Sequence, residues 1–420
     1  MIFFNNPQNI LKQCSLVYSF LDFVQIDTQS DPNSDTTPST QKQFDLQKLL
    51  EKKLEALGCV DIKLDDKAYL YATFPGNAPK AKVIGLMAHV DTAPDFSGTG
   101  VKPIVHDSYD GSPIILPKKD VVIDPSESEE LEKCIGDAII TASGDTLLGA
   151  DDKAGIAVIL SALEILGNDD SISRPTLRIA FTPDEEIGRG ALDFDVEGFD
   201  AYCAYTLDGG FAGEVNFETF SADKAEVTFT GVAVHPGFAK GKLVNALRYL
   251  GKFLDALPND ESPESTKDRQ GFFHPVNVKG NASEASAELI LRDFDDDILA
   301  ERGARLRQLT SDIATSEPRL KTEVKITQQY RNMAGVLADH PKVRDYLLQA
   351  VTDAEIQPNN NPVRGGTDGS GLSAKGLPTP NIFAGGVNFH GPREWISTRV
   401  MAQSVCTVLN LVQRWAQDGQ

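Results

Sequence analysis

Six short segments of the sequence contain the residue types that bind metal ions. Each segment has a histidine, a carboxylate or both. They are His89-Val90-Asp91, Gly149 to Gly155, Pro183 to Glu186, Thr206 to Gly210, Arg364 to Gly369 and Asn388 to Gly391. Histidine combined with carboxylates suits a borderline divalent cation such as zinc. Because the segments lie far apart in the sequence, only a fold can bring them together, so they predict an active site and an architecture at once.

His89 and Asp91 lie two residues apart at the expected end of a strand, so their side chains can leave the same face. One of them can bind a metal while the aspartate accepts the second imidazole N–H, which fixes the tautomer. The alternative is a surface loop that happens to contain one histidine and one aspartate. The buried strand expected before His89 favours the metal site.

Two acidic segments also have ordinary explanations. Asp151 and Asp152 precede an expected helix, and N-capping accounts for one aspartate, which leaves the other available to bridge two cations. Asp184, Glu185 and Glu186 could be a solvated charged face. At the carboxyl edge of a buried sheet, however, such like charges need a cation. One glutamate could then bind the metal while its neighbour acts as general base toward a water whose pKa the metal has lowered.

Asp208 and His390 give weaker signals. Asp208 precedes Gly209, which is typical of a turn, and His390 could be an ordinary surface histidine. Only six histidines occur in the chain, however, and two of them fall in these segments. The joint occurrence of the segments at expected strand ends therefore favours a metal site.

Strands and helices alternate around the first segments. Helices are expected at Gln43–Leu57 and Lys153–Leu166, and strands at Ala81–Ala88, Leu177–Phe181 and Ala201–Tyr205. This order predicts an α/β fold with a mixed sheet covered by helices on both faces. In such sheets ligands bind beyond the carboxyl ends of the strands, where the acidic segments lie. Later elements are expected at Pro341–Ala354 (helix), Asn381–Ala384 (the strand that delivers His390) and Ile396–Trp415 (helix).

The pattern changes near residue 219, where the order becomes strand, helix, strand, strand, helix, strand. The expected strands are Lys224–Val234, Phe272–Lys279, Glu284–Phe294 and Thr322–Gln328, and the helices are Lys242–Leu257 and Ile298–Ala314. This order is that of an α+β ferredoxin-like unit. We predict an inserted domain at 219–331, with the first domain formed by 1–218 and 332–420.

Composition restricts the class of protein. A chain of 420 residues exceeds one ordinary core, so two domains are expected. The net charge of −21 disfavours nucleic acid and anionic membranes as partners. The five cysteines form no C-x-x-C pair, which argues against a disulfide framework and for a cytoplasmic location. We see neither a signal peptide nor an apolar run of the roughly 18 residues that span a membrane.

Taken together, the segments resemble the M20 family of di-zinc metallopeptidases, and within it the tripeptide aminopeptidases. The runs that carry the resemblance are His89 to Thr92, Leu147 to Ile156, Ala180 to Glu186, Tyr205 to Gly210, Val234 to Gly237, Arg364 to Gly369 and Pro380 to Phe383. They span nearly the whole chain. Met1 to Pro7 looks like an extension outside the pattern, and Asn332-Met333-Ala334 departs from the charged sequence expected there.

The resemblance implies a zinc-peptidase-like catalytic domain with an inserted lid domain and two Zn²⁺ ions, for which Co²⁺ or Mn²⁺ could substitute. The implied roles are Asp151 as the bridging ligand, His89 and Asp208 on one ion, Glu186 and His390 on the other, Glu185 as general base and then acid, and Asp91 orienting His89. In the lid, His235 would stabilise the oxyanion. Asn245 and Arg292 would hold a peptide carboxylate, and Arg364 is a further candidate for substrate binding.

These roles predict an enzyme that acts on small peptides and releases the N-terminal residue of tripeptides by attack of metal-activated water. Two alternatives stay open. One is another M20-type amidohydrolase, a dipeptidase or deacylase, and the other is a catalytically silent protein that binds metal or peptide. The sequence leaves the oligomeric state open, a homodimer included.

Overall fold

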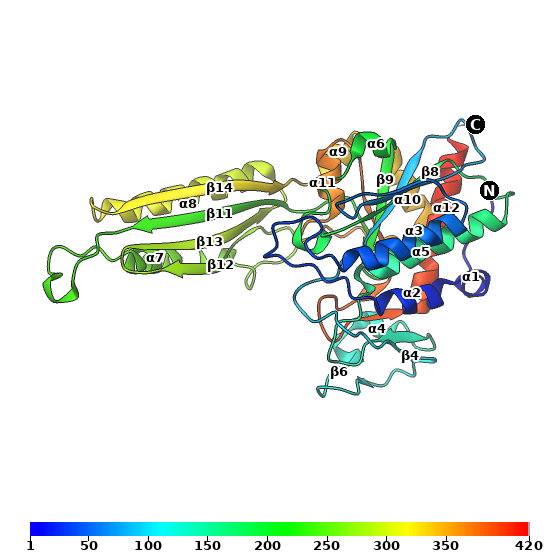
Figure 1. Cartoon of the computed structure of the whole chain (residues 1–420), viewed down its shortest axis with the longest axis horizontal. Coiled ribbons are helices and arrows are strands. Elements are labelled where there is room, and N and C mark those ends of the chain that lie inside the picture. The colour runs from blue at the N-terminus through cyan, green and yellow to red at the C-terminus, as the bar shows by residue number, and fades with distance from the viewer. Residues whose placement is uncertain (419–420) are drawn as a thin grey trace. The chain divides into compact units, whose positions relative to one another are not determined.

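A seven-stranded mixed sheet forms the centre of the larger part of the molecule in the computed structural model, which describes residues 1–418 (Figure 1). Its strand order is β1-β2-β8-β3-β9-β15-β10. The strands are β1 (Val60–Leu64), β2 (Leu70–Phe74), β3 (Ile84–His89), β8 (Leu177–Thr182), β9 (Cys203–Gly209), β10 (Val215–Asn216) and β15 (Asn381–Phe383). The neighbours β8, β3, β9 and β15 run parallel, so their carboxyl ends meet at one edge of the sheet.

Side chains alternate between the two faces of this sheet, as the period of a strand requires. In β3, Leu86 and Ala88 join the large core, whereas Met87 joins a smaller cluster on the opposite face. The large core includes α5 (Ala150–Asn168) and α12 (Thr398–Gln417), and the smaller one includes residues of α6 (Val196–Phe199) and α11 (Asp368–Ala374). Helices therefore cover both faces of a mixed sheet, which confirms the predicted fold class.

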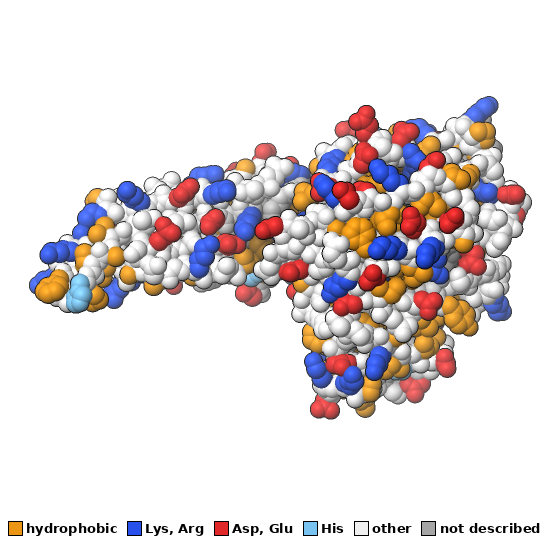
Figure 2. Space-filling model, in the orientation of Figure 1, with side chains coloured by type: hydrophobic (Ala, Val, Ile, Leu, Met, Phe, Trp, Pro, Cys, Tyr) orange, Lys and Arg blue, Asp and Glu red, His pale blue; other side chains and the backbone are white. Residues whose placement is uncertain are grey.

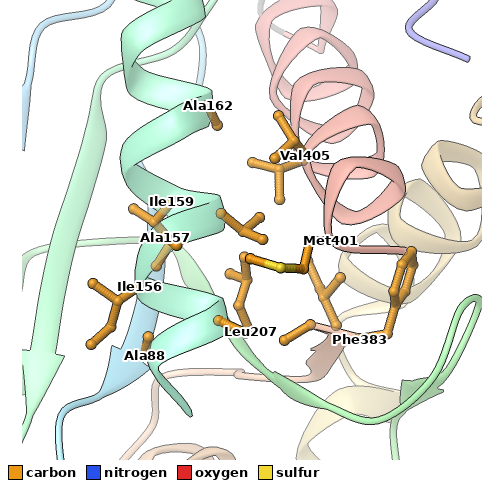
Figure 3. Close-up of a cluster of buried hydrophobic side chains, with 14 of the residues drawn as sticks. Ala88, Ile156, Ala157, Ile159, Ala162, Leu207, Phe383, Met401 and Val405 are labelled. Atoms are coloured by element: carbon orange, nitrogen blue, oxygen red, sulfur yellow. The ribbon is translucent and has the colours of Figure 1, made fainter. Parts of the chain in front are cut away.

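Helix α5 is apolar around most of its circumference because it is enclosed by other elements. It contacts β3 and β9 on one side, and α12 packs on it from another. Figure 3 shows side chains from these elements and from β15 meeting in one core. This core lies directly behind the segments that carry the acidic residues.

Further elements complete this part of the chain. The helices are α1 (Pro7–Gln13), α2 (Leu16–Val24), α3 (Gln43–Ala56), α4 (Glu129–Glu132), α9 (Ala334–Ala338) and α10 (Pro341–Asp353). A second sheet has the order β16-β17-β7-β4, from β4 (Ile104–His106), β7 (Ile139–Thr141), β16 (Gly386–Val387) and β17 (Trp395–Ser397). Strands β5 (Ile114–Ile115) and β6 (Val122–Ile123) form a separate hairpin.

Contacts divide the chain into two compact units. The first contains Met1–Phe217, Met333–Asn361 and the chain from Thr367 onward, and the second contains Glu218–Asn332 with Pro362–Gly366. Residues 362–366 thus group with the second unit, although the sequence-based limits of the inserted domain leave them outside it. Those limits stay a prediction.

The second unit is a four-stranded antiparallel sheet in the order β12-β13-β11-β14. Its elements along the chain are β11 (Ser221–Thr230), α7 (Ala246–Asp255), β12 (Phe272–Gly280), β13 (Glu284–Asp293), α8 (Asp296–Thr315) and β14 (Lys321–Tyr330). The two helices contact each other and the sheet, and Phe229, Phe253 and Leu306 lie in the core between them. This is the predicted ferredoxin-like order of elements.

The surface carries many charged side chains (Figure 2). Acidic and basic side chains are interspersed on the face shown in Figure 2. Among residues 1–418, no helix has both the length and the apolar character that crossing a bilayer requires.

Substitution in the core behind the acidic segments tests the packing of the first unit. Ile159 is fully buried in α5, so Ile159→Ala should lower the free energy of unfolding by about 2–5 kcal/mol through lost burial and a residual cavity. Urea unfolding followed by tryptophan fluorescence measures this unit, because both tryptophans, Trp395 and Trp415, are buried in it. Ile135→Ala, at a side chain 63% exposed, is the control and should change stability by less than about 0.5 kcal/mol. Equal effects of the two substitutions would contradict this packing.

Candidate metal centre and active site

His89 is the last residue of β3 and is almost completely buried. Its Nε2 lies 2.8 Å from Asp151 Oδ1 and 3.5 Å from Asp208 Oδ1. Its other ring nitrogen, Nδ1, lies 3.0 Å from the backbone oxygen of Asp91 and 3.4 Å from that residue's Oδ1. The ring is therefore fixed from the Nδ1 side, and Nε2 faces two carboxylates.

Asp152 has the capping role that the sequence allowed for this pair, and Asp151 is oriented for the bridging role. Both have non-helical dihedral angles inside the first turn of α5. Asp152 Oδ1 accepts the N–H of Gly155 (3.2 Å), which is a capping interaction, and its Oδ2 accepts the N–H of His89 (3.2 Å). Asp151 instead points one oxygen at each of two imidazoles, Oδ1 at His89 and Oδ2 at His390 Nε2 (3.3 Å). That is the arrangement of a carboxylate able to bridge two cations.

His390 and Glu186 form the second side of this arrangement. His390 Nε2 lies 2.9 Å from Glu186 Oε2. The other oxygen of Glu186, Oε1, is buried and has no hydrogen-bond partner among residues 1–418. The expectation that strand β15 delivers His390 is wrong. The histidine follows the short strand β16 and has a left-handed backbone, with φ of 61°.

Asp208 lies inside strand β9, so the alternative of an Asp-Gly turn is not adopted. Strand β9 continues through Gly209, which pairs with Phe383 of β15. Pairing on both sides of β9 fixes the direction of the Asp208 side chain toward His89.

Glu185 begins a short 3-10 helix after β8 and borders a small cavity together with His89, Asp208 and Asp368. Asp91 anchors this turn, because its two carboxylate oxygens accept the N–H groups of Glu185 (3.0 Å) and Glu186 (3.2 Å). From the sequence, the expected role of Asp91 is only to orient His89. The structure adds that Asp91 connects the end of β3 to the acidic turn after β8.

Comparison with known proteins agrees with this geometry. The family model described as peptidase family M20/M25/M40 matches residues 145–414. Peptidase T of Geobacillus sp. (strain WCH70) is 43% identical over 406 residues, covering 96% of this chain and 99% of that protein. Peptidase T of Bacillus velezensis is 44% identical over 400 residues, covering 95% of this chain and 98% of that protein.

The chain belongs to peptidase family M20/M25/M40. Two solved structures share its fold. The aminopeptidase PepT of Bacillus cereus ATCC 10987 has a TM-score of 0.76 at 22% identity and covers 98% of this chain and 99% of that one. A tripeptidase of Staphylococcus aureus has a TM-score of 0.77 at 23% identity, again covering 98% and 99%. As a member of this family, the chain is a metallopeptidase that acts on peptides.

The residues at the M20 site fit metal ions. Two groups, His89 with Asp151 and Glu186, and His89 with Asp152 and Asp208, have one donor atom from each member within 4.8 Å of the others. Ligands around a tetrahedral zinc ion lie about 3.4 Å from one another, close to the 2.8–3.5 Å between the imidazoles and carboxylates here. Because Asp152 already accepts two backbone N–H groups, we regard Asp151 and Asp208 as the better ligands beside His89.

The pKa values of the side chains at the site also favour bound cations. Burial, together with the charge of Asp151, raises the pKa of Glu186 to about 8 and that of Asp208 to about 6. Hydrogen bonds to Asp151 and Glu186 raise the pKa of His390 to about 11. Burial, then the charges of Asp208 and Asp368, raise the pKa of Glu185 well above its usual value. So many partly buried carboxylates in one place favour the binding of cations.

Two of the expected substrate-binding residues cap helices of the second unit. His235 lies before a 3-10 helix, and its Nδ1 accepts the N–H of Gly237 (3.2 Å). Asn245 is the N-cap of α7, where its Oδ1 accepts the N–H of Leu247 (3.0 Å). A capping role does not occupy the rest of either side chain, and binding by both stays a prediction.

The two arginines have partners inside the same unit. Arg292 of β13 donates to Gln329 Oε1 (3.1 Å) and lies over the ring of Tyr330. Arg364 donates to the backbone oxygens of Asp268 (2.8 Å) and Gln270 (2.9 Å), which ties its segment to a neighbouring loop. These contacts give Arg364 a structural task, and its role toward substrate also stays a prediction.

Two residues of the site received no role from the sequence. Asp368 is buried and its Oδ2 accepts the hydroxyl of Thr182 (2.6 Å), at the end of β8. Asp368 lies in one of the six segments, so its position near the site could be predicted from the sequence. Its hydrogen bond to Thr182 could not. Glu394 is buried behind the Asp151 segment, and its only sequence signal is its position four residues after His390.

The raised pKa values predict how metal affinity depends on pH. In the metal-free protein near neutral pH, Glu186 and His390 each retain a proton, because their pKa values are about 8 and about 11. Both must lose it to bind a cation, so affinity should rise between about pH 6 and pH 8, with protons released on binding. Calorimetric titration of chelator-treated protein with Zn²⁺, in buffers of different ionisation enthalpy, measures both quantities. Affinity that stays constant across this range would contradict the protonation states.

Proposed function

We propose that this protein is an aminopeptidase that releases the N-terminal residue of tripeptides with the help of two zinc ions. The observation that carries the proposal is the carboxylate of Asp151, which places one oxygen on each of two imidazoles. The names of the relatives support the choice of substrate, since the sequence relatives are peptidase T and one structural relative is a tripeptidase. A location in the cytoplasm accords with five unpaired cysteines.

In this proposal Asp151 bridges the ions, His89 and Asp208 complete the ligands of one, and Glu186 with His390 those of the other. Zinc suits the mixture of imidazole and carboxylate donors, and Co²⁺ or Mn²⁺ could take its place. Bound ions would polarise the scissile carbonyl and lower the pKa of water. The unpartnered Oε1 of Glu186 supports a ligand role, because a buried carboxylate oxygen without a hydrogen bond is costly.

Glu185 would act as general base and then as general acid. Its carboxylate takes a proton from the attacking water and returns it to the nitrogen of the leaving amine as the C–N bond breaks. Cations bound to the neighbouring carboxylates would oppose the charges that now raise its pKa, so that it can ionise. The N–H contact to Asp91 fixes the backbone of the turn from which it reaches the site.

In the proposed function, residues of the second unit bind the substrate. His235 would stabilise the developing oxyanion, and Asn245 with Arg292 would bind the peptide's terminal carboxylate. This part rests on the family resemblance, on the exposure of His235 and on the partial exposure of Asn245. Arg364 is the least favoured candidate, because its donors already bind backbone oxygens.

A substrate panel tests the proposed activity. Zinc-loaded protein should release the N-terminal amino acid from tripeptides and lose this activity when a chelator removes the metal. Dipeptides and N-acyl amino acids should be poor substrates. Preference for one of those classes would favour a dipeptidase or a deacylase, and a zinc-loaded protein without turnover would favour a silent binding protein.

Two substitutions distinguish the proposed general base from the proposed metal ligands. Glu185→Gln should leave two ions bound and lower kcat by about 10²–10⁴-fold, because the water loses its proton acceptor. His390→Ala should instead reduce the metal content, since it removes a proposed ligand from one ion. Elemental analysis with steady-state kinetics measures both. An unchanged kcat in Glu185→Gln, or full metal occupancy in His390→Ala, would reject the corresponding role.

A further inference from the structure

Glu394 is a buried carboxylate that accepts three backbone N–H groups. Its Oε2 accepts those of Leu148 (2.7 Å) and Gly149 (2.8 Å), and its Oε1 accepts that of Asp151 (3.1 Å). The residue is 1% exposed. A buried anion with three fixed donors is anchored firmly, because loss of the anion would leave those donors unpaired.

The three donors belong to the segment that presents Asp151. Gly149 has a left-handed backbone with φ of 81°, and Asp151 has extended dihedral angles of −83° and 106°. The first N–H groups of a helix have no partner within the helix, and here the segment is also bent away from helical geometry. Glu394 supplies the missing acceptors from a distant part of the chain.

Glu394 is itself held in place by the second sheet. Trp395, the next residue, begins β17 and pairs with Thr141 of β7. Strand β7 leads into the segment that ends at Asp151, so the pairing fixes Glu394 relative to its donors. His390 lies in the turn just before Glu394, so the turn between β16 and β17 carries both this imidazole and the acceptor for the Asp151 segment.

We propose that Glu394 is a positioning residue that holds the Asp151 segment so that one carboxylate oxygen faces each imidazole. The inference rests on the proposed function only in treating Asp151 as a metal ligand. Within residues 1–418, the Glu394 side chain forms hydrogen bonds to backbone N–H groups and none to either imidazole, so it acts through the backbone of residues 148–151. Its effect should therefore appear as altered metal affinity and ligand geometry.

Glu394→Gln tests this inference with little change in shape. Glutamine keeps one acceptor oxygen and replaces the other by an amide that donates, so either the Asp151 N–H or the Leu148–Gly149 pair meets a donor. Affinity for zinc should fall by about 10–100-fold, the usual effect of losing a partner that supports a ligand. With metal in excess, kcat should fall while KM stays close to that of the unaltered protein, because no substrate contact has changed.

The matched control is Glu164→Gln, on the far part of α5, where the carboxylate accepts the backbone N–H of Ser15 (3.0 Å). It should leave metal affinity unchanged. The Co²⁺-loaded proteins give a readout independent of activity, since the visible spectrum of Co²⁺ reports ligand geometry. It should change in Glu394→Gln and stay the same in Glu164→Gln.

The outcomes separate this inference from the proposed function. Glu394→Gln that binds zinc with unaltered affinity and an unaltered Co²⁺ spectrum would overturn the role of Glu394 alone. An unaltered protein that binds no metal would overturn the proposed function first. If Glu394→Gln does not fold, Glu394→Asp replaces it, because aspartate keeps both acceptors but withdraws them by one methylene. It should lose affinity to a smaller extent, and unaltered affinity there would equally reject the inference.

Discussion

The repulsion among buried carboxylates at one edge of the central sheet is the constraint on which the site depends. Asp151, Glu185, Glu186 and Asp208 are each only partly exposed there, so water solvates their charges poorly. Two imidazoles offset part of the charge, which lowers the pKa of Asp151 although its burial has the opposite effect. The pKa values of the other three carboxyls are raised, and Glu186, with a pKa of about 8, retains a proton near neutral pH in the metal-free protein. Binding of a cation would replace that proton, so metal affinity depends on the electrostatics of the fold.

The parallel strands explain how residues far apart in sequence reach this edge. Strands β8, β3 and β9 are neighbours, and each ends with a residue or turn of the site. The turn after β8 is fixed from both sides, because Asp91 binds its N–H groups and Ser39 donates its N–H to Asp184 (2.7 Å). Glu394 likewise accepts backbone N–H groups of the segment at the start of α5 and fixes it. Loops without regular structure are thus held by carboxylates that accept backbone N–H groups.

Much of this could be predicted from the sequence, for a physical reason. A buried parallel strand is a continuous apolar run, and a polar residue directly after it, such as His89 or Glu185, must lie at the sheet edge. The position of His390 could not be predicted in this way, because it depends on β16, a strand of two residues paired with β17. Glu394 could not be found either. An acceptor for distant N–H groups has no periodicity or spacing, and only the pairing of β17 with β7 gives it its partners.

The acidic residues near the site fall into two classes by their hydrogen-bond partners, and this division supports the proposed set of ligands. Asp91, Asp152, Asp184 and Glu394 each accept at least one backbone N–H, so each of these side chains is already tied to a segment of the fold. Within residues 1–418, the side chains of Asp151, Glu186 and Asp208 contact imidazoles and, for Asp208, also Asp151, without a backbone donor, and one oxygen of Glu186 has no partner. A buried carboxylate oxygen without a donor, such as Glu186 Oε1, is costly. In the proposed function a cation would be its partner, and Asp151, which faces both imidazoles, would share that cation with a second one.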